Sequence, residues 1–311
     1  MLYENLIEAI GNTPLVELQR LSPKPGVRFF AKLEGQNPTG SVKDRIVKYM
    51  IEEAERSGEL THDRVVLEPT SGNTGISLGL ICLLKGYKLK VVMPESVSEE
   101  RTQLLRAFGA EIVYSEGLKG TNGSIVVAQE MVADDPTYFM PYQYGNEANP
   151  RAHYETTGPE ILRDLPDVDV FIAGLGTGGT LTGVGHYLKE QRPEVKIVAC
   201  VPHPGDLVQG LRSLEEGFIP PVLDESVLDG KIVVDSPTSF AATKELTQAE
   251  GIFAGISAGA VLRTAQRVAE RLDRGNIVLL LADGGWKYLS TALWSKDYED
   301  LGEEIEGKVW W

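Results

Sequence analysis

The chain has 311 residues, of which 42% are hydrophobic and 24% are charged, as in an ordinary globular protein with room for two domains. Its formal net charge of −15 argues against nucleic-acid binding through counterion release. No apolar run is long enough to span a membrane, and the N-terminal residues lack the basic and apolar regions of a secretory signal. We therefore expect a cytoplasmic protein without membrane or nucleic-acid partners.

Short apolar runs alternate with helix-like segments, which predicts an α/β fold with a mainly parallel sheet. The predicted strands cover residues 29–33, 64–68, 90–93, 111–114, 170–173, 196–201 and 277–281. The predicted helices cover residues 74–84, 98–108, 124–134, 181–190, 240–250 and 258–271. A boundary is expected near residues 141–146, where a second series of strands and helices begins. Residues 202–237 are irregular, which in a compact domain suggests a functional segment.

The turn at residues 37–45, which reads Asn-Pro-Thr-Gly-Ser-Val-Lys-Asp-Arg, carries the strongest chemical signal. Its first four residues are typical of a turn, and Ser41 can cap a helix that begins at Val42. Lys43 then lies in the first turn of the helix, where the positive end of the helix dipole disfavours its charged form. Such an amine is suited to nucleophilic catalysis, and an exposed surface lysine is the ordinary alternative.

Three glycine-rich turns each join a predicted strand to a predicted helix. Residues 68–75 (Glu-Pro-Thr-Ser-Gly-Asn-Thr-Gly) offer hydroxyls and helix N-terminal N–H groups to a carboxylate, or else form a plain turn. Residues 174–180 (Gly-Leu-Gly-Thr-Gly-Gly-Thr) can direct N–H groups at a phosphate. Their GxGxxG spacing also fits a dinucleotide, but the next strand ends without the acidic residue that a ribose needs. The third turn, residues 255–260, places Ser257 at a helix start. The ordinary role of a serine there is to cap the helix, without any contact to a ligand.

A poised lysine, a phosphate loop and a carboxylate loop together indicate pyridoxal phosphate acting on an amino acid. From residues 11–15 (Gly-Asn-Thr-Pro-Leu) to 283–285 (Asp-Gly-Gly), the chain resembles the cysteine synthase and cystathionine β-synthase family of fold-type II pyridoxal phosphate enzymes. The resemblance implies an α/β protein of two domains, each a mainly parallel sheet flanked by helices, with the cofactor in the cleft between them. Residues 1–38 and 146–311 would form the large cofactor-binding domain, and residues 39–145 a smaller, mobile domain. The family is usually dimeric, so a homodimer is expected.

The resemblance also implies a role for each motif residue. Lys43 would hold the cofactor as a Schiff base and move the substrate's α-proton. Asn73 would hydrogen-bond the cofactor's phenolic oxygen, and Ser257 would contact its pyridine nitrogen. The substrate carboxylate would be held by Thr70, Ser71, Thr74 and Gln143, and the cofactor phosphate by Gly176, Thr177, Gly178, Gly179 and Thr180. A serine stabilises a protonated pyridine less than an aspartate would, which favours loss of a β-leaving group over transamination. The implied reaction is β-replacement through an aminoacrylate, with a sulfur nucleophile.

The leaving group is indicated by residues 209–220, which read Gln-Gly-Leu-Arg-Ser-Leu-Glu-Glu-Gly-Phe-Ile-Pro. O-acetylserine enzymes of the family usually carry a glycine where this chain has Arg212, and a guanidinium fork suits a phosphate dianion. The segment is similar to the O-phosphoserine sulfhydrylase branch. In that branch the sulfur donor is a small ubiquitin-like carrier protein with a C-terminal thiocarboxylate; sulfide is the other candidate donor. A surface arginine paired with Glu215 or Glu216 is the alternative interpretation.

Other interpretations stay open on the sequence alone. In the O-phosphoserine branch the C-terminal residues, here 305–311, fold over the active site, but they could equally pack on the surface. O-acetylserine sulfhydrylase and cystathionine β-synthase are the rival enzymes; dehydratases share the fold, but residues 41–45 match the sulfhydrylase form of the lysine motif better. A scaffold protein that has lost its chemistry and an NAD-dependent dehydrogenase are alternatives outside the class. Cys82 and Cys200 are expected to be buried thiols, the four histidines form no cluster, and no metal site is expected.

Overall fold

The computed structural model describes residues 2–70, 72–95, 97, 99–117, 120–206 and 208–296. These residues form ten strands and nine α-helices. The strands are β1 (Leu15–Leu18), β2 (Val27–Leu33), β3 (Val65–Pro69), β4 (Lys88–Pro94), β5 (Glu111–Ser115), β6 (Tyr138–Phe139), β7 (Val170–Gly174), β8 (Lys196–Pro202), β9 (Gly230–Val234) and β10 (Gly275–Leu281). The helices are α1 (Lys43–Ser57), α2 (Asn73–Lys85), α3 (Glu99–Ala107), α4 (Gly120–Asp134), α5 (Ala148–Ala152), α6 (Gly158–Asp164), α7 (Gly179–Gln191), α8 (Ser236–Glu250) and α9 (Ile256–Ala269). No helix among the described residues is long and apolar enough to cross a membrane.

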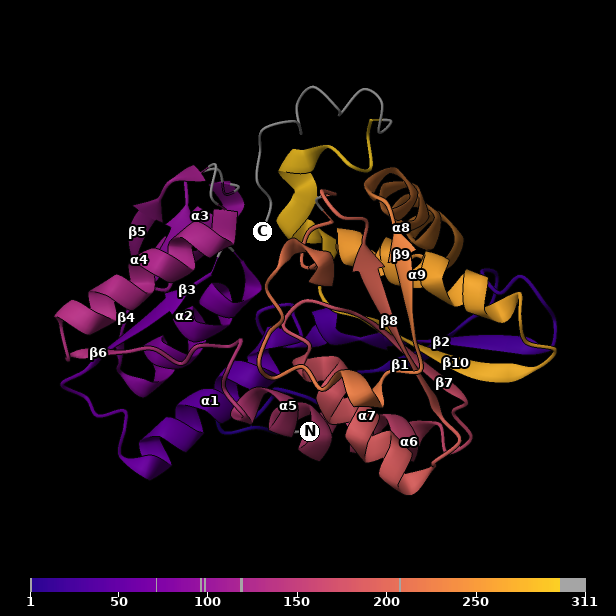
Figure 1. Ribbon diagram of the computed structural model, residues 1–311, viewed down its shortest axis with the longest axis horizontal. Coiled ribbons are helices and arrows are strands. Elements are labelled where there is room, and N and C mark those ends of the chain that lie inside the picture. The colour runs from indigo at the N-terminus through magenta and orange to yellow at the C-terminus, as the bar shows by residue number, and fades with distance from the viewer. Residues whose placement is uncertain are drawn as a thin grey trace.

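The strands form two sheets that lie side by side (Figure 1). The larger sheet has the order β1-β2-β10-β7-β8-β9, and β1 is its antiparallel member. The smaller sheet, at the left of Figure 1, has the order β5-β4-β3-β6 and is parallel throughout. The predicted α/β fold with two mainly parallel sheets flanked by helices is therefore confirmed. The domain limits at residues 38 and 145 stay a prediction.

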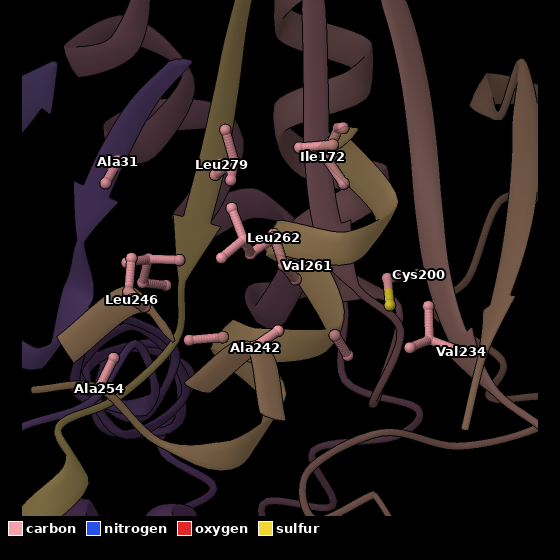
Figure 2. Packing of buried hydrophobic residues seen from close by; sticks show 14 of the residues in the cluster. Ala31, Ile172, Cys200, Val234, Ala242, Leu246, Ala254, Val261, Leu262 and Leu279 are labelled. Carbon is pink, nitrogen blue, oxygen red and sulfur yellow. The ribbon is translucent and has the colours of Figure 1, made fainter. Parts of the chain in front are cut away.

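Helices cover both faces of the large sheet because neighbouring residues of each strand point to opposite faces. On one face, Ile172 of β7 and Cys200 of β8 pack with residues of α8 and α9 (Figure 2). On the other face, Phe171 and Ile197 pack with residues of α6 and α7. Helices therefore bury both faces of the strands whose ends build the site.

The small sheet is covered in the same way. Helices α1, α2 and α3 share a buried cluster with one of its faces, and α4 packs on the other. Both cysteines are buried and free, as predicted, and burial raises the pKa of each thiol to about 12. Both thiols are therefore protonated near neutral pH.

All seven predicted strands are present, with shifted ends. The helix predicted to begin at Val42 and the six other predicted helices are present as well. The structure adds β1, β6 and β9 and a helical segment over residues 148–164, whose middle turn, His153–Thr157, is a π-helix. Strand β6 has two residues, and β9 lies at the edge of the sheet with alternating exposure, so neither forms an apolar run. Helix α8 begins at Ser236 rather than at residue 240, because the Asp235 side chain caps it.

A buried network of charges joins α1 to the large sheet. The Arg45 guanidinium donates to both carboxylate oxygens of Glu34, at 2.7 and 2.9 Å, and to both of Glu160, each at 2.7 Å. The Lys32 amine donates to Glu160 at 2.7 Å, and Thr13 donates to Glu34 at 2.6 Å. Arg45 lies two residues after Lys43, so this network holds the helix turn that presents the predicted catalytic lysine.

Candidate active site

One pocket among the described residues is lined by loops that follow strands of both sheets. Eleven of the thirteen predicted site residues line it: Lys43, Thr70, Asn73, Thr74, Gln143, Gly176, Thr177, Gly178, Thr180, Arg212 and Ser257. Gly179 is the first residue of α7, directly behind the lining, and Ser71 lies outside the described residues. Because parallel strands end at the same edge of a sheet, motifs far apart in the chain meet in this pocket.

Lys43 is the first residue of α1, one residue later than the predicted helix start. The Ser41 hydroxyl accepts a hydrogen bond from the Lys43 N–H at 3.3 Å, and Val42 N–H donates to Ala282 O at 2.8 Å. This second bond fixes the start of α1 against the end of β10. Removal from water lowers the pKa of the Lys43 amine, and the Asp283 carboxylate opposes this shift. A larger neutral fraction of the amine makes it a better nucleophile.

The loop between β7 and α7 is shaped for close approach of its backbone. Gly178 has a φ of +88°, in the left-handed region that favours glycine. A Cβ atom at Gly176 would come within 2.7 Å of Gly210 O, and one at Gly179 would overlap the Asn149 side chain. The loop therefore leads its N–H groups to the N-terminus of α7 without side chains in the way, which suits a phosphate.

His153 supports this loop from the π-helical turn, a contact that the sequence did not reveal. Its Nε2 lies 3.1 Å from the Thr180 hydroxyl and its Nδ1 lies 2.9 Å from the Thr157 hydroxyl. Burial, which is the largest cause, and the nearby Arg45 charge lower the pKa of His153 to about 3. The ring is therefore neutral and positions Thr180.

The predicted carboxylate loop is tied to Gln143 on the neighbouring strand connection. The Thr74 hydroxyl donates to the Gln143 side-chain oxygen at 2.7 Å. Glu68, at the end of β3, accepts hydrogen bonds from the backbone N–H groups of Tyr142 at 2.8 Å and Gln143 at 3.1 Å. Tyr142 has a φ of 55°, an uncommon conformation for a non-glycine residue that these bonds help to hold. Burial raises the pKa of Glu68 to about 7.

Asn73 lies at the centre of a chain of hydrogen bonds around the pocket. Its amide nitrogen donates to an Asp283 oxygen at 2.7 Å, and its amide oxygen accepts from the Lys287 amine at 2.6 Å. Tyr288 donates to the same Asp283 oxygen at 2.6 Å, while the other Asp283 oxygen has no partner among the described residues. An ammonium must face the amide oxygen, so Lys287 fixes which way the Asn73 amide points. The segment that begins at Asp283 therefore positions Asn73 through both Asp283 and Lys287.

Ser257 and Arg212 occupy other parts of the wall. The N-cap of α9 is Gly255, so Ser257 is not the cap of that helix, and its side chain lines the pocket. The Arg212 guanidinium lies 5.4 Å from the centre of the Tyr144 ring and 4.8 Å from that of Phe218. It also donates to the Asn122 side-chain oxygen at 3.4 Å. These contacts place the guanidinium at the pocket.

The donor set fits pyridoxal phosphate. It combines a glycine cradle at a helix N-terminus, an amine of lowered pKa and an amide fixed by Lys287. Among the described residues, no group of three or more histidine, cysteine, aspartate or glutamate side chains could hold a metal ion.

The chain belongs to the family described as pyridoxal-phosphate dependent enzyme, whose model matches residues 6–283. Its cofactor is therefore pyridoxal phosphate, as the motifs predicted. The recognition of a fold-type II enzyme of this family from the motifs is confirmed.

Relatives in the same family are similar over nearly the whole chain. The cysteine synthase of Staphylococcus aureus is 43% identical over 304 residues, which cover 94% of this chain and 98% of that protein. A hydrogen sulfide-producing enzyme from Fusobacterium nucleatum is 42% identical, with a TM-score of 0.87 over 92% of this chain and 100% of its own. A cysteine synthase (OASS) from Entamoeba histolytica is 34% identical, with a TM-score of 0.90 over 98% of this chain and 96% of its own.

Proposed function

We propose that this protein is a cysteine synthase that performs β-replacement on O-phosphoserine. The sulfur donor is a thiocarboxylated carrier protein or sulfide. The similarity to cysteine synthases supports the reaction class, and the position of Arg212 in the pocket wall supports the phosphate leaving group. A guanidinium fork pairs with a phosphate dianion, whereas a neutral acetyl ester gains little from it.

Each protein group has a defined task in this reaction. The Lys43 amine removes the α-proton of the amino acid; the bond from Cβ to oxygen then breaks, and phosphate leaves with the electron pair. The sulfur nucleophile forms the new bond to Cβ, and Lys43 returns the proton to Cα. When bound, pyridoxal phosphate supplies the sink for the electron pair released at Cα. Arg212 stabilises the charge that grows on the departing phosphate.

The test compares O-phosphoserine with O-acetylserine on the purified, cofactor-loaded protein. We expect kcat/KM to be higher for O-phosphoserine. In Arg212→Ala this preference should fall about 10- to 100-fold, the effect of losing charged hydrogen bonds. Arg212→Lys keeps the charge without the fork and should restore part of it. Equal preference in the unsubstituted protein and in Arg212→Ala would refute the assignment of Arg212.

O-acetylserine sulfhydrylase activity is the second candidate, since the similar Entamoeba histolytica enzyme is described as a cysteine synthase with the abbreviation OASS. A preference for O-acetylserine would support it and would leave Lys43 and the cofactor site unchanged. The sulfur donor is tested separately, by supplying sulfide or a thiocarboxylated carrier and measuring cysteine.

A predicted lid, residues 305–311, lies outside the described residues. The homodimer is part of the proposal and predicts a mass of twice 34.0 kDa by light scattering.

A further inference from the structure

A second arginine, Arg101 of α3, lines the active-site pocket and was not found from the sequence. Its side chain is buried, with only 2% of the residue exposed. Within the described part of the chain, its Nε and Nη1 atoms have no hydrogen-bond partner. The guanidinium lies 5.4 Å from the centre of the Tyr288 ring, a contact that compensates buried charge only in part.

A buried guanidinium with two unpaired nitrogens is costly, because it has lost water without gaining an anion. Such a group is stable in a pocket when a ligand supplies the missing negative charge. Since Arg101 lines the same pocket as Lys43 and Asn73, a ligand in that pocket can reach it. The unpaired nitrogens therefore indicate an anion-binding subsite.

The position of Arg101 shows which part of the pocket this subsite occupies. A Cβ atom built on Gly72 would lie 3.7 Å from Arg101 Nε and 3.8 Å from its Cζ. Gly72 is the N-cap of α2, a helix of 13 residues with no side-chain cap. The first N–H groups of a helix lack partners within it and carry partial positive charge. Arg101 and the first turn of α2 thus offer two independent sets of donors to one anion.

We propose that Arg101 is a further ligand of the α-carboxylate of the amino-acid substrate, beside the predicted carboxylate loop and the first turn of α2. The side chains predicted to hold this carboxylate, among them Thr70, Thr74 and Gln143, are neutral and can orient it without balancing its charge. A guanidinium balances the charge and matches the planar carboxylate with two parallel hydrogen bonds. Arg212, which stacks on Tyr144 and Phe218, stays available for the leaving group. The inference rests on the amino-acid substrate of the proposed function but not on its leaving group.

The test measures binding of L-alanine and L-alaninamide to the cofactor-loaded protein by calorimetry. The two ligands share an amine and lack a β-leaving group, and they differ in the carboxylate. In Arg101→Met and Arg101→Gln, we expect binding of L-alanine to weaken on the order of 10- to 100-fold, with binding of L-alaninamide unchanged. Arg101→Lys should recover part of the loss because it keeps the charge. Arg106→Met removes the same charge from the exposed side of α3 and should bind both ligands normally.

A purely structural arginine predicts a different result. Its substitution would weaken the binding of L-alanine and L-alaninamide equally, or would leave the binding of both unchanged while lowering the melting temperature. Either result would overturn the proposal. If the neutral variants do not fold, Arg101→Lys decides: it should bind L-alanine less tightly than the unsubstituted protein, and unchanged binding would refute the inference. Neither ligand tests the leaving group, so the O-phosphoserine assignment can fail while this inference holds.

Discussion

Two buried arginines of this protein, Arg45 of α1 and Arg101 in the wall of the active site, have opposite surroundings. Arg45 donates to the carboxylates of Glu34 and Glu160 with all three of its side-chain nitrogens. Burial, the largest single effect, would raise the pKa of Glu160, but the hydrogen bonds and charges of Arg45 and Lys32 together outweigh it and lower this pKa to about 2. Arg101 is as deeply buried, and two of its nitrogens have no partner among the described residues.

The difference separates stability from binding. A charge whose partners are all supplied by the fold contributes to holding elements together, as Arg45 holds α1 to the large sheet. A buried charge without partners destabilises the free protein and gains its partner from a ligand. Buried arginines thus cannot be assigned a role from burial alone, and the count of satisfied nitrogens decides between the two roles.

Breaking the paired side of this comparison should have the largest effect. Arg45→Met leaves the carboxylates of Glu34 and Glu160 buried without their main counter-charge. Removing one partner of a buried ion pair costs about 3–5 kcal/mol of folding free energy. We expect a corresponding fall in the free energy of unfolding, measured with urea. Arg56→Met, an exposed arginine of the same helix with 69% of its side chain accessible, should change it by less than about 1 kcal/mol. Similar losses in the two variants would contradict the stabilising role of the network.

Glu68 sharpens the comparison, because it is a buried carboxylate that accepts hydrogen bonds from the backbone N–H groups of Tyr142 and Gln143 rather than from a cation. Burial raises its pKa from 4.5 to about 7. Between these values the native state holds a proton that the unfolded state has lost, so stability falls as the pH rises. The shift corresponds to about 3 kcal/mol lost between about pH 4.5 and pH 7.

Glu68→Gln removes this titration, so its unfolding free energy should fall less between pH 5 and pH 7 than that of the unsubstituted protein. The slope is the measured quantity, since the substitution itself also changes the hydrogen bonds to Tyr142 and Gln143. Glu59→Gln, at an exposed position just after α1, should keep the original slope. An unchanged slope in Glu68→Gln would show that Glu68 is ionised throughout this range.

Lys287 is intermediate between the two arginines, since it is a buried cation whose hydrogen bonds go to neutral oxygens of Asn73 and Gly40. Burial lowers its pKa to about 8, against the attraction of Asp283 and Asp44. Lys287→Met should free the Asn73 amide and weaken cofactor binding by about tenfold, the effect of one charged hydrogen bond. The dissociation constant is measured from the cofactor absorbance after dialysis. Lys88→Met, an exposed lysine, is the control, and equal cofactor affinity in both variants would remove the positioning role of Lys287.

Much of the fold could be predicted because its signals are local. The apolar run of β10 and the glycines between β7 and α7 follow directly from periodicity and turn chemistry. The same holds for Lys43, whose place at a helix start depends on the turn that precedes it. Strand β9 was missed because an edge strand with alternating exposure has no apolar run. The π-helical turn at His153–Thr157 was not predicted, and the contact of the His153 ring with Thr180 could not be, because 27 positions of the chain separate the two residues.

By itself, the sequence determined the order of the main strands and helices, the cofactor class and eleven of the residues that line the pocket. Each of these depends on residues close together in the chain. Only the tertiary structure decided which charged groups have partners. Lys287 meets Asn73 across 214 positions of the chain, and Arg45 meets Glu160 across 115. Arg101 reads in sequence as one more polar residue of an amphipathic helix, and its role emerges only where folding removes it from water without supplying an anion.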